Sequence, residues 1–164
     1  MIEATVAAAI LALLTSLATP AFVGSIERHR VEGTTYQLRT DIRYAHSEAR
    51  ARGETVRIGF WDTTAGSCYV MHTGEHCRCT HEGLAVCEAS ARPLRTVLLP
   101  AQSGVRLHAN VAHMTFDGQR HTVTPAAAIS IQSAHTPPLR TIVNVLGRTR
   151  VCAPAGAIAG YKPC

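Results

Sequence analysis

The feature that most constrains the fold of this chain is the apolar stretch at its N-terminus. From Ala4 to Ala18 the sequence has no charged side chain, and one acid, Glu3, precedes the stretch. An α-helix rises about 1.5 Å per residue, so roughly 20 apolar residues can cross the hydrocarbon core of a bilayer. We therefore predict a membrane-spanning helix over residues 1–25. A carboxylate at the edge of such a helix needs a positive partner, which marks Glu3 as functional.

The alternative for this segment is a secretory signal peptide that is removed from the mature protein. Such a peptide begins with a basic region and ends at a cleavage site of small residues in the A-x-A pattern. Here the flank is acidic, and no convincing A-x-A site precedes Phe22. We therefore expect the segment to be retained.

A second helical pattern follows over residues 26–53, and its apolar face is different. Its apolar positions recur at spacings of three and four, which places them on one stripe of an otherwise charged helix. The stripe consists of Val31, Thr35, Leu38, Ile42, Ala45 and Ala49. Pro20 would kink a continuous helix, because proline removes a backbone donor. We predict one long helix whose second half packs on a sheet and ends near Gly53.

After Gly53 the hydrophobic period changes to two, as in half-buried strands. The predicted strands lie at residues 56–60, 69–71, 96–99, 105–107, 114–116, 119–123, 128–132 and 141–146. Asp117-Gly118 is expected to form a two-residue hairpin turn. A helix followed by a run of antiparallel strands predicts an α+β fold. Residues 26–164 then form one head, with the sheet in residues 54–164.

Six cysteines beside an export-type apolar helix indicate an oxidising compartment and favour disulfides. Cys152 and Cys164 are expected to pair, since no other cysteine lies near the C-terminus. Cys77 and Cys79 are too close in sequence to pair comfortably with each other. If the stretch 68–87 pairs internally, two connectivities remain open: Cys68 with Cys77 and Cys79 with Cys87, or Cys68 with Cys79 and Cys77 with Cys87.

A zinc site is the alternative for the cysteine-rich stretch, in which case the protein would be a periplasmic metal-binding module. The candidate ligands are His72, His76, Cys77, Cys79 and His81. Their spacing matches neither a CxxC pair nor an HExxH motif, and thiols in this compartment usually oxidise. We expect no metal and no cofactor. No nucleophile elbow, phosphate loop or pair of carboxylates on one element is found either, so we expect no enzymatic activity.

The C-terminal part of the chain has uniformly positive charge. No acidic residue follows Asp117, and the basic residues beyond it are Arg120, Arg140, Arg148, Arg150 and Lys162. Arg148 and Arg150 are two residues apart, so an extended backbone would project both from one face. Lys162 would lie nearby if the Cys152–Cys164 loop folds back.

Guanidinium groups that no local carboxylate compensates suit phosphate oxygens. This pattern predicts contacts to a nucleic-acid backbone, with little discrimination between bases. One alternative is a solvated edge strand, where charge opposes aggregation. Another is a docking surface for an acidic neighbouring protein.

The N-terminal segment MIEATVAAAILALL, with Glu3 and the later Pro20, resembles the first helix of type IV pilins and pseudopilins. The resemblance implies that the Glu3 carboxylate pairs with the N-terminal ammonium of a neighbouring subunit. In that family a leader is cut after a Gly, and the mature chain starts with a methylated Phe. By this register Met1 is the third mature position and the Gly-Phe site is not in the sequence. Either the sequence is an incomplete record of the precursor or its processing differs.

The Phe116-Asp117-Gly118 segment and the closing Gly147-Arg148-x-Arg150-x-Cys152 resemble the GspH/FimT group of minor pilins. Some FimT-type minor pilins of naturally transformable bacteria carry Gly-Arg-x-Arg in this tail and take part in DNA uptake. The resemblance implies a DNA site in this chain, made of Gly147, Arg148, Arg150, Arg140 and Lys162.

The same resemblance implies partners and a location. The expected partners are other pilins in a filament, DNA and the inner membrane, which the N-terminal helix would span once. The head would lie in the periplasm of a Gram-negative bacterium and be exported into a cell-surface pilus. A competing implication is a GspH-type pseudopilin of type II secretion, whose head docks protein partners.

Overall fold

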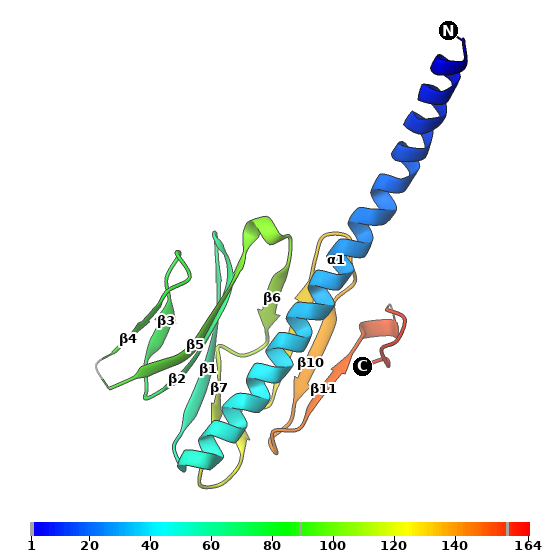
Figure 1. Ribbon diagram of the computed structural model, residues 1–164. Helices are drawn as coiled ribbons and strands as arrows, with labels where there is room; N and C mark the ends of the chain where they lie inside the picture. Colours follow the sequence, from blue (N-terminus) through cyan, green and yellow to red (C-terminus); the bar gives the residue numbers. More distant parts are fainter. Residues whose placement is uncertain (1, 89, 157) are drawn as a thin grey trace.

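The computed structural model describes the backbone of residues 2–88, 90–156 and 158–164, over which one long helix precedes eleven strands (Figure 1). The side chains of residues 2, 4, 7–9, 11, 13–21 and 155 lie outside this description. The elements are α1 (Ile2–Arg52), β1 (Val56–Thr63), β2 (Gly66–Thr73), β3 (Cys77–Cys79), β4 (Ala85–Cys87), β5 (Arg92–Pro100), β6 (Arg106–Ala109), β7 (His113–Phe116), β8 (Val123–Thr124), β9 (Ala127–Gln132), β10 (Leu139–Val143) and β11 (Thr149–Cys152), with single 3-10 turns at Ala101–Ser103 and Pro154–Gly156.

Helix α1 packs its predicted apolar stripe against the strands, so the predicted α+β fold is confirmed. All members of the stripe are buried: Val31, Thr35, Leu38, Ile42, Ala45 and Ala49. They belong to one core with inward side chains of the strands, such as Ile58, Met114 and Ile129. The stripe begins at Val31, and the N-terminal half of α1 extends beyond the strands (Figure 1).

Over the described ranges the strands form two larger antiparallel sheets, both packed on α1. The first has the order β5-β2-β1-β7-β8, and the second has the order β11-β10-β9-β6. They are joined where the Leu107 N–H of β6 donates a hydrogen bond of 3.1 Å to the Ser67 hydroxyl of β2. In both sheets alternate side chains point toward α1 and form the core. The remaining side chains form an outer face, directed away from the helix.

A buried carboxylate ties α1 to the first sheet. Asp41 is 1% exposed; it accepts a hydrogen bond of 2.6 Å from the Tyr69 hydroxyl and makes a salt bridge of 3.0 Å with Arg95. Burial and the hydrogen bond to Asp41 raise the pKa of Tyr69, so its hydroxyl is a protonated donor at neutral pH. A buried charge is costly unless donors surround it, so these contacts favour one rotational setting of α1 on the sheet.

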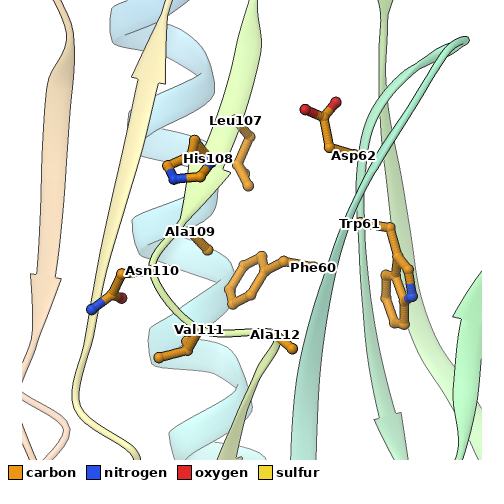
Figure 2. A pocket seen from close by; sticks show the side chains of 9 residues that line it. All are labelled: Phe60, Trp61, Asp62, Leu107, His108, Ala109, Asn110, Val111 and Ala112. Atoms are coloured by element: carbon orange, nitrogen blue, oxygen red, sulfur yellow. The ribbon is translucent and has the colours of Figure 1, made fainter.

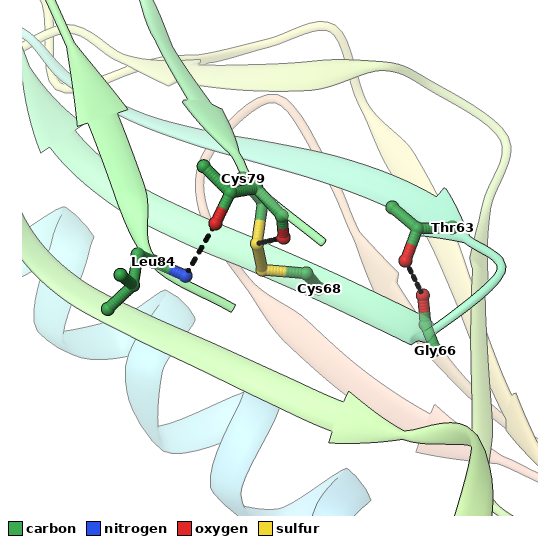
Figure 3. Close-up of a disulfide and its surroundings, with 6 residues drawn as sticks. Thr63, Gly66, Cys68, Cys79 and Leu84 are labelled. Carbon is green, nitrogen blue, oxygen red and sulfur yellow. Dashed lines mark hydrogen bonds between the residues drawn. A yellow bond between two sulfur atoms is a disulfide. The ribbon is translucent and has the colours of Figure 1, made fainter. Parts of the chain in front are cut away.

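The small hairpin β3–β4 covers part of the outer face of the first sheet. Two disulfides hold it: Cys68–Cys79 and Cys77–Cys87. Figure 3 shows the first of them, which links β2 to β3. Of the two connectivities that the sequence left open, the structure has the second. Beneath the hairpin Val70 and Trp61 pack with the first disulfide in a separate apolar cluster.

The predicted two-residue turn at Asp117-Gly118 is wrong, although β7 and β8 do pair as a hairpin. The loop spans residues 117–122, and the Asp117 carboxylate accepts the N–H groups of Gln119 and Arg120, both at 2.9 Å. Gly118 is needed for close packing under the end of α1, because a Cβ there would lie 2.3 Å from the Ala49 carbonyl oxygen. Residues 119–122 are therefore loop instead of strand.

The N-terminal segment is helical, and α1 continues without a break through Pro20. In the part of the chain that the structure describes, no helix combines the length and the hydropathy that a bilayer crossing requires. The side chain of Pro20 and most side chains of segment 1–25 lie outside the described residues. The span and the role of Pro20 in assembly therefore stay predictions.

Candidate nucleic-acid interface

The arginine pair predicted from the sequence enters the last strand from a tight loop between β10 and β11. The loop is closed by the Asn144 N–H, which donates a hydrogen bond of 3.2 Å to the Arg148 carbonyl. The Asn144 side-chain oxygen accepts the Arg148 N–H at 2.9 Å. Gly147, the last loop residue, has a φ of 73°. A hairpin loop of three residues usually ends in this left-handed conformation, which glycine adopts without a Cβ penalty.

Gly147 is also packed closely against α1. A Cβ at this position would lie 2.8 Å from the His46 ring, and His46 in turn packs near Phe116, with ring centroids 6.2 Å apart. The glycine of the Gly-Arg-x-Arg segment thus holds the hairpin in place and positions the arginines that follow. Sequence reasoning gave no hint of His46 as its support, because the two residues are a hundred positions apart.

The pairing register places three arginines on the outer face of the second sheet. Ile142 lies opposite Arg150, and Arg140 lies opposite Cys152. Because residues two apart share a face, Arg140 and Arg150 project from the same side of neighbouring strands. As diagonal neighbours they are separated by about 7–8 Å. Arg148, opposite Asn144, continues the same register, and both Arg148 and Arg150 are exposed.

The outer face continues across the sheet to β6. His108, Ser130 and Arg140 are opposite one another on β6, β9 and β10, and Arg140 Nε donates to the Ser130 hydroxyl at 3.4 Å. We call this surface the basic face; its members are Arg106, His108, Arg140, Arg148 and Arg150. Sequence reasoning missed Arg106 and His108. The signal was present, since residues 106–109 alternate between polar and apolar side chains.

Acidic groups are scarce around the basic face. Among the side chains that the structure describes, the basic face makes one salt bridge, which joins Arg106 to Asp62 at 3.4 Å. Arg140, Arg148 and Arg150 therefore carry charge that no described carboxylate neutralises by direct contact. Uncompensated guanidinium groups at this spacing can contact successive phosphates of one strand.

The C-terminal tail folds back beside the end of β11. The Cys152–Cys164 disulfide closes it, the Ala153 N–H donates to the Lys162 carbonyl at 3.0 Å, and Arg28 of α1 donates to the Ala159 carbonyl at 3.0 Å. Lys162 thus lies near Cys152, which is opposite Arg140. The structure brings Lys162 to the Arg140 end of the basic face, whereas Arg148 lies just before the other end of β11.

The cysteine pairing bears directly on the zinc alternative. Cys77 and Cys79, the thiol ligands that it requires, are both in disulfides. In the described part of the chain no group of three His, Cys, Asp or Glu side chains is placed to hold a metal ion. His72 is buried, and this burial lowers its pKa, so its ring is neutral at pH 7.

Comparison with known proteins places this fold in a family. The sequence matches the family model described as type II transport protein GspH over residues 34–147, well over half of the chain. The chain belongs to the GspH family. The GspH match extends from the middle of α1 to the end of the β10–β11 loop, so Arg148, Arg150 and the tail follow the matched region.

Solved structures with this fold include two crystal structures of the type IV minor pilin FimU from Pseudomonas aeruginosa. Both are 17% identical to this GspH-family chain, with TM-scores of 0.55 and 0.54. They cover 80% and 78% of this chain and 98% and 100% of the FimU chains. At this identity the similarity is one of fold. A comparison with curated protein sequences gives no match.

Proposed function

We propose that this GspH-family protein is a minor pilin of a type IV pilus that binds DNA without sequence preference through its basic face. The observation that carries the proposal is the register of β10 and β11, which makes Arg140 and Arg150 diagonal neighbours on one outer face. Arg148 extends the row, and no described carboxylate contacts these three side chains. Contacts of this kind go to phosphates and carry no sequence information.

The assembly part of the proposal rests on α1 and on the family. Segment 1–25 would anchor the chain in the inner membrane and then join the core of a filament, with Glu3 paired to a neighbouring subunit. The head would face the periplasm and, after export, the cell surface. DNA captured there would enter natural transformation. This role needs no cofactor and no catalytic group.

The DNA proposal is tested by titration at several salt concentrations. We expect the chain to bind unrelated duplexes alike, with a dissociation constant of micromolar or weaker, typical of non-specific contacts. Arg148→Gln with Arg150→Gln should lower the slope of log K against log salt by about 2 and weaken all sequences together. These two side chains make no described contact that the fold requires.

Arg43→Gln with Arg50→Gln on α1 is the matched control, since both arginines are exposed and the change in net charge is the same. The control pair should bind DNA nearly as the parent does. If the Arg148/Arg150 pair binds like the parent, or binding does not depend on salt, the basic face is not the DNA site.

The second candidate is a pseudopilin of type II secretion whose head docks other proteins, favoured by the description of the matched family. In that case the basic face would meet an acidic protein surface. The Arg148/Arg150 variant would then lose incorporation into the assembly, while the parent protein would show no affinity for DNA.

A further inference from the structure

Two adjoining cavities lie beside the basic face, on the other side of β6. One has a volume of about 240 Å³ and lies between β1 and β6 (Figure 2). The other, about 500 Å³, lies between β1, the start of β7 and the base of β3. Phe60, Trp61 and Ala112 line both cavities. We call these two cavities together the Trp61 groove.

Trp61 is the only tryptophan in the chain. It lines both cavities, and its ring lies on the side of β1 opposite to the Phe60 ring (Figure 2). Its ring lies over the backbone of Gly59, where a Cβ would approach the indole to 2.2 Å. The disulfide-held hairpin packs against it in the small apolar cluster. The indole is thus held in place yet only partly buried. Rigid aromatic rings in open grooves are the platforms on which unpaired bases stack.

Hydrogen-bonding groups surround the larger cavity. Its polar lining consists of Arg57, His72, Glu75, His76 and His113. The Arg57 guanidinium donates to the Gly74 carbonyl, which fixes it at the cavity wall and leaves further N–H groups free to donate. The neutral His72 ring is 3% exposed and its Nδ1 lies 3.4 Å from the Thr73 carbonyl oxygen, so only Nε2 is left, as an acceptor. Such a mixed set of donors and acceptors matches the polar edge of a nucleobase.

The Trp61 groove and the basic face meet at His108, which belongs to both. This residue lines the smaller cavity and is also the β6 member of the row that leads to Arg140. Two strand spacings, about 10 Å, separate the His108 and Arg140 backbones. A single strand whose phosphates lie on the arginines would reach Trp61 by passing His108 and following the smaller cavity to β1. A duplex keeps its base faces stacked inside and cannot place a base there without unpairing.

We propose that the Trp61 groove receives an unpaired base of a single-stranded nucleic acid whose phosphates lie on the basic face. The inference rests on the proposed function and adds to it a preference for single strands. In this proposal the cysteine-rich hairpin holds the indole in position at the groove.

The test uses the full chain in a non-ionic detergent and two probes of equal length and charge. One probe is oligothymidylate, whose bases are largely unstacked, and the other is an abasic deoxyribose-phosphate oligomer. We expect oligothymidylate to bind between about fivefold and a hundredfold more tightly than the abasic probe, the range for one stacked base. We also expect it to quench the emission of the single tryptophan, which the abasic probe should leave unchanged.

Trp61→Leu should bring the two probes to equal affinity, since leucine retains apolar packing but offers no flat ring. Tyr36→Leu on α1 is the control, because Tyr36 is an aromatic side chain that is 70% exposed, and α1 packs on the inner face of the first sheet whereas Trp61 lies on its outer face. The fluorescence arm uses the unaltered protein, so it remains informative if Trp61→Leu does not fold.

Equal affinity of the parent for both probes, with unchanged emission, would overturn the base site while leaving phosphate binding by the basic face intact. Absence of binding to both probes and to duplex DNA would overturn the proposed function itself. The two failures are therefore distinguishable.

Discussion

Replacing Gly147 by alanine should destabilise the head, and the structure allows the loss to be divided into two parts. The first part is backbone strain, because Gly147 has a φ of 73° and a left-handed conformation costs an L-residue about 1–2 kcal/mol. The second part is the clash of the new methyl group with the His46 ring at 2.8 Å. Overpacking of this kind costs typically about 1–3 kcal/mol. The total expected loss is about 2–5 kcal/mol.

Gly104→Ala is the control that isolates the strain. Gly104 has a φ of 71°, and a Cβ there would meet nothing within 4 Å. Urea unfolding followed by Trp61 emission should give a loss of about 1–2 kcal/mol for Gly104→Ala and a larger loss for Gly147→Ala. The difference between the two measures the clash.

His46→Ala completes a double-mutant cycle, because it removes the ring that the new methyl group would strike. In that background Gly147→Ala should cost no more than Gly104→Ala does in the parent. If Gly147→Ala is as mild as Gly104→Ala without the His46 change, the reasoning from close packing is refuted. Unchanged DNA affinity of the folded Gly147→Ala variant would likewise refute the role of Gly147 in positioning Arg148 and Arg150.

Four further changes test other parts of the molecule. Tyr69→Phe should destabilise the head by about 1.5–3 kcal/mol in the same urea assay, because it leaves buried Asp41 without one of its donors, whereas exposed Tyr36→Phe should have no effect. Hydrogen bonds from His135 and Ser133 lower the pKa of Glu27. Stability from this group is therefore full above the unfolded pKa of about 4.3 and is lost as the pH falls through the folded value. In the parent the urea midpoint should fall as the pH is lowered from about 5 to about 3. In Glu27→Gln this fall should be smaller. Glu3→Ala should leave the head folded but reduce incorporation into filaments, as measured by the amount of the variant in sheared pili. A chain starting at Ile26 should be soluble and show no free thiols by mass spectrometry, whereas two or more free thiols would contradict the three disulfides.

The second half of α1 was predictable because its interactions follow a single period. The whole stripe from Val31 to Ala49 is buried against the strands, so the spacing of the apolar residues predicts which face of the helix packs. That Arg148 and Arg150 project from the same face was predictable for the same reason, since a strand has a period of two. Arg106 was not, because its place on the basic face depends on how β6 pairs with β9.

The features that sequence reasoning missed depend on contacts between distant segments. The Asp-Gly pair at 117–118 is a strong local hairpin signal. In the structure Gly118 is needed instead because its backbone lies too close to the Ala49 carbonyl oxygen for a Cβ to fit. β3 and β4 are short and held by disulfides, so alternation of side chains did not reveal them. The cysteine spacing alone was compatible with two pairings, and only the position of Cys68 under the hairpin distinguishes them.

The close contact between Gly147 and His46 also makes α1 a spacer. With residues 1–25 in a bilayer, the helical rise puts about 30 Å between the membrane boundary and the level of His46. The potential of anionic headgroups decays over a Debye length of about 8 Å at physiological salt. If segment 1–25 lies in a bilayer as proposed, Arg148 would stand beyond the reach of that lipid surface. Its charge would then stay available to polyanions in solution, and insertions or deletions in α1 would change that distance in steps of about 1.5 Å per residue.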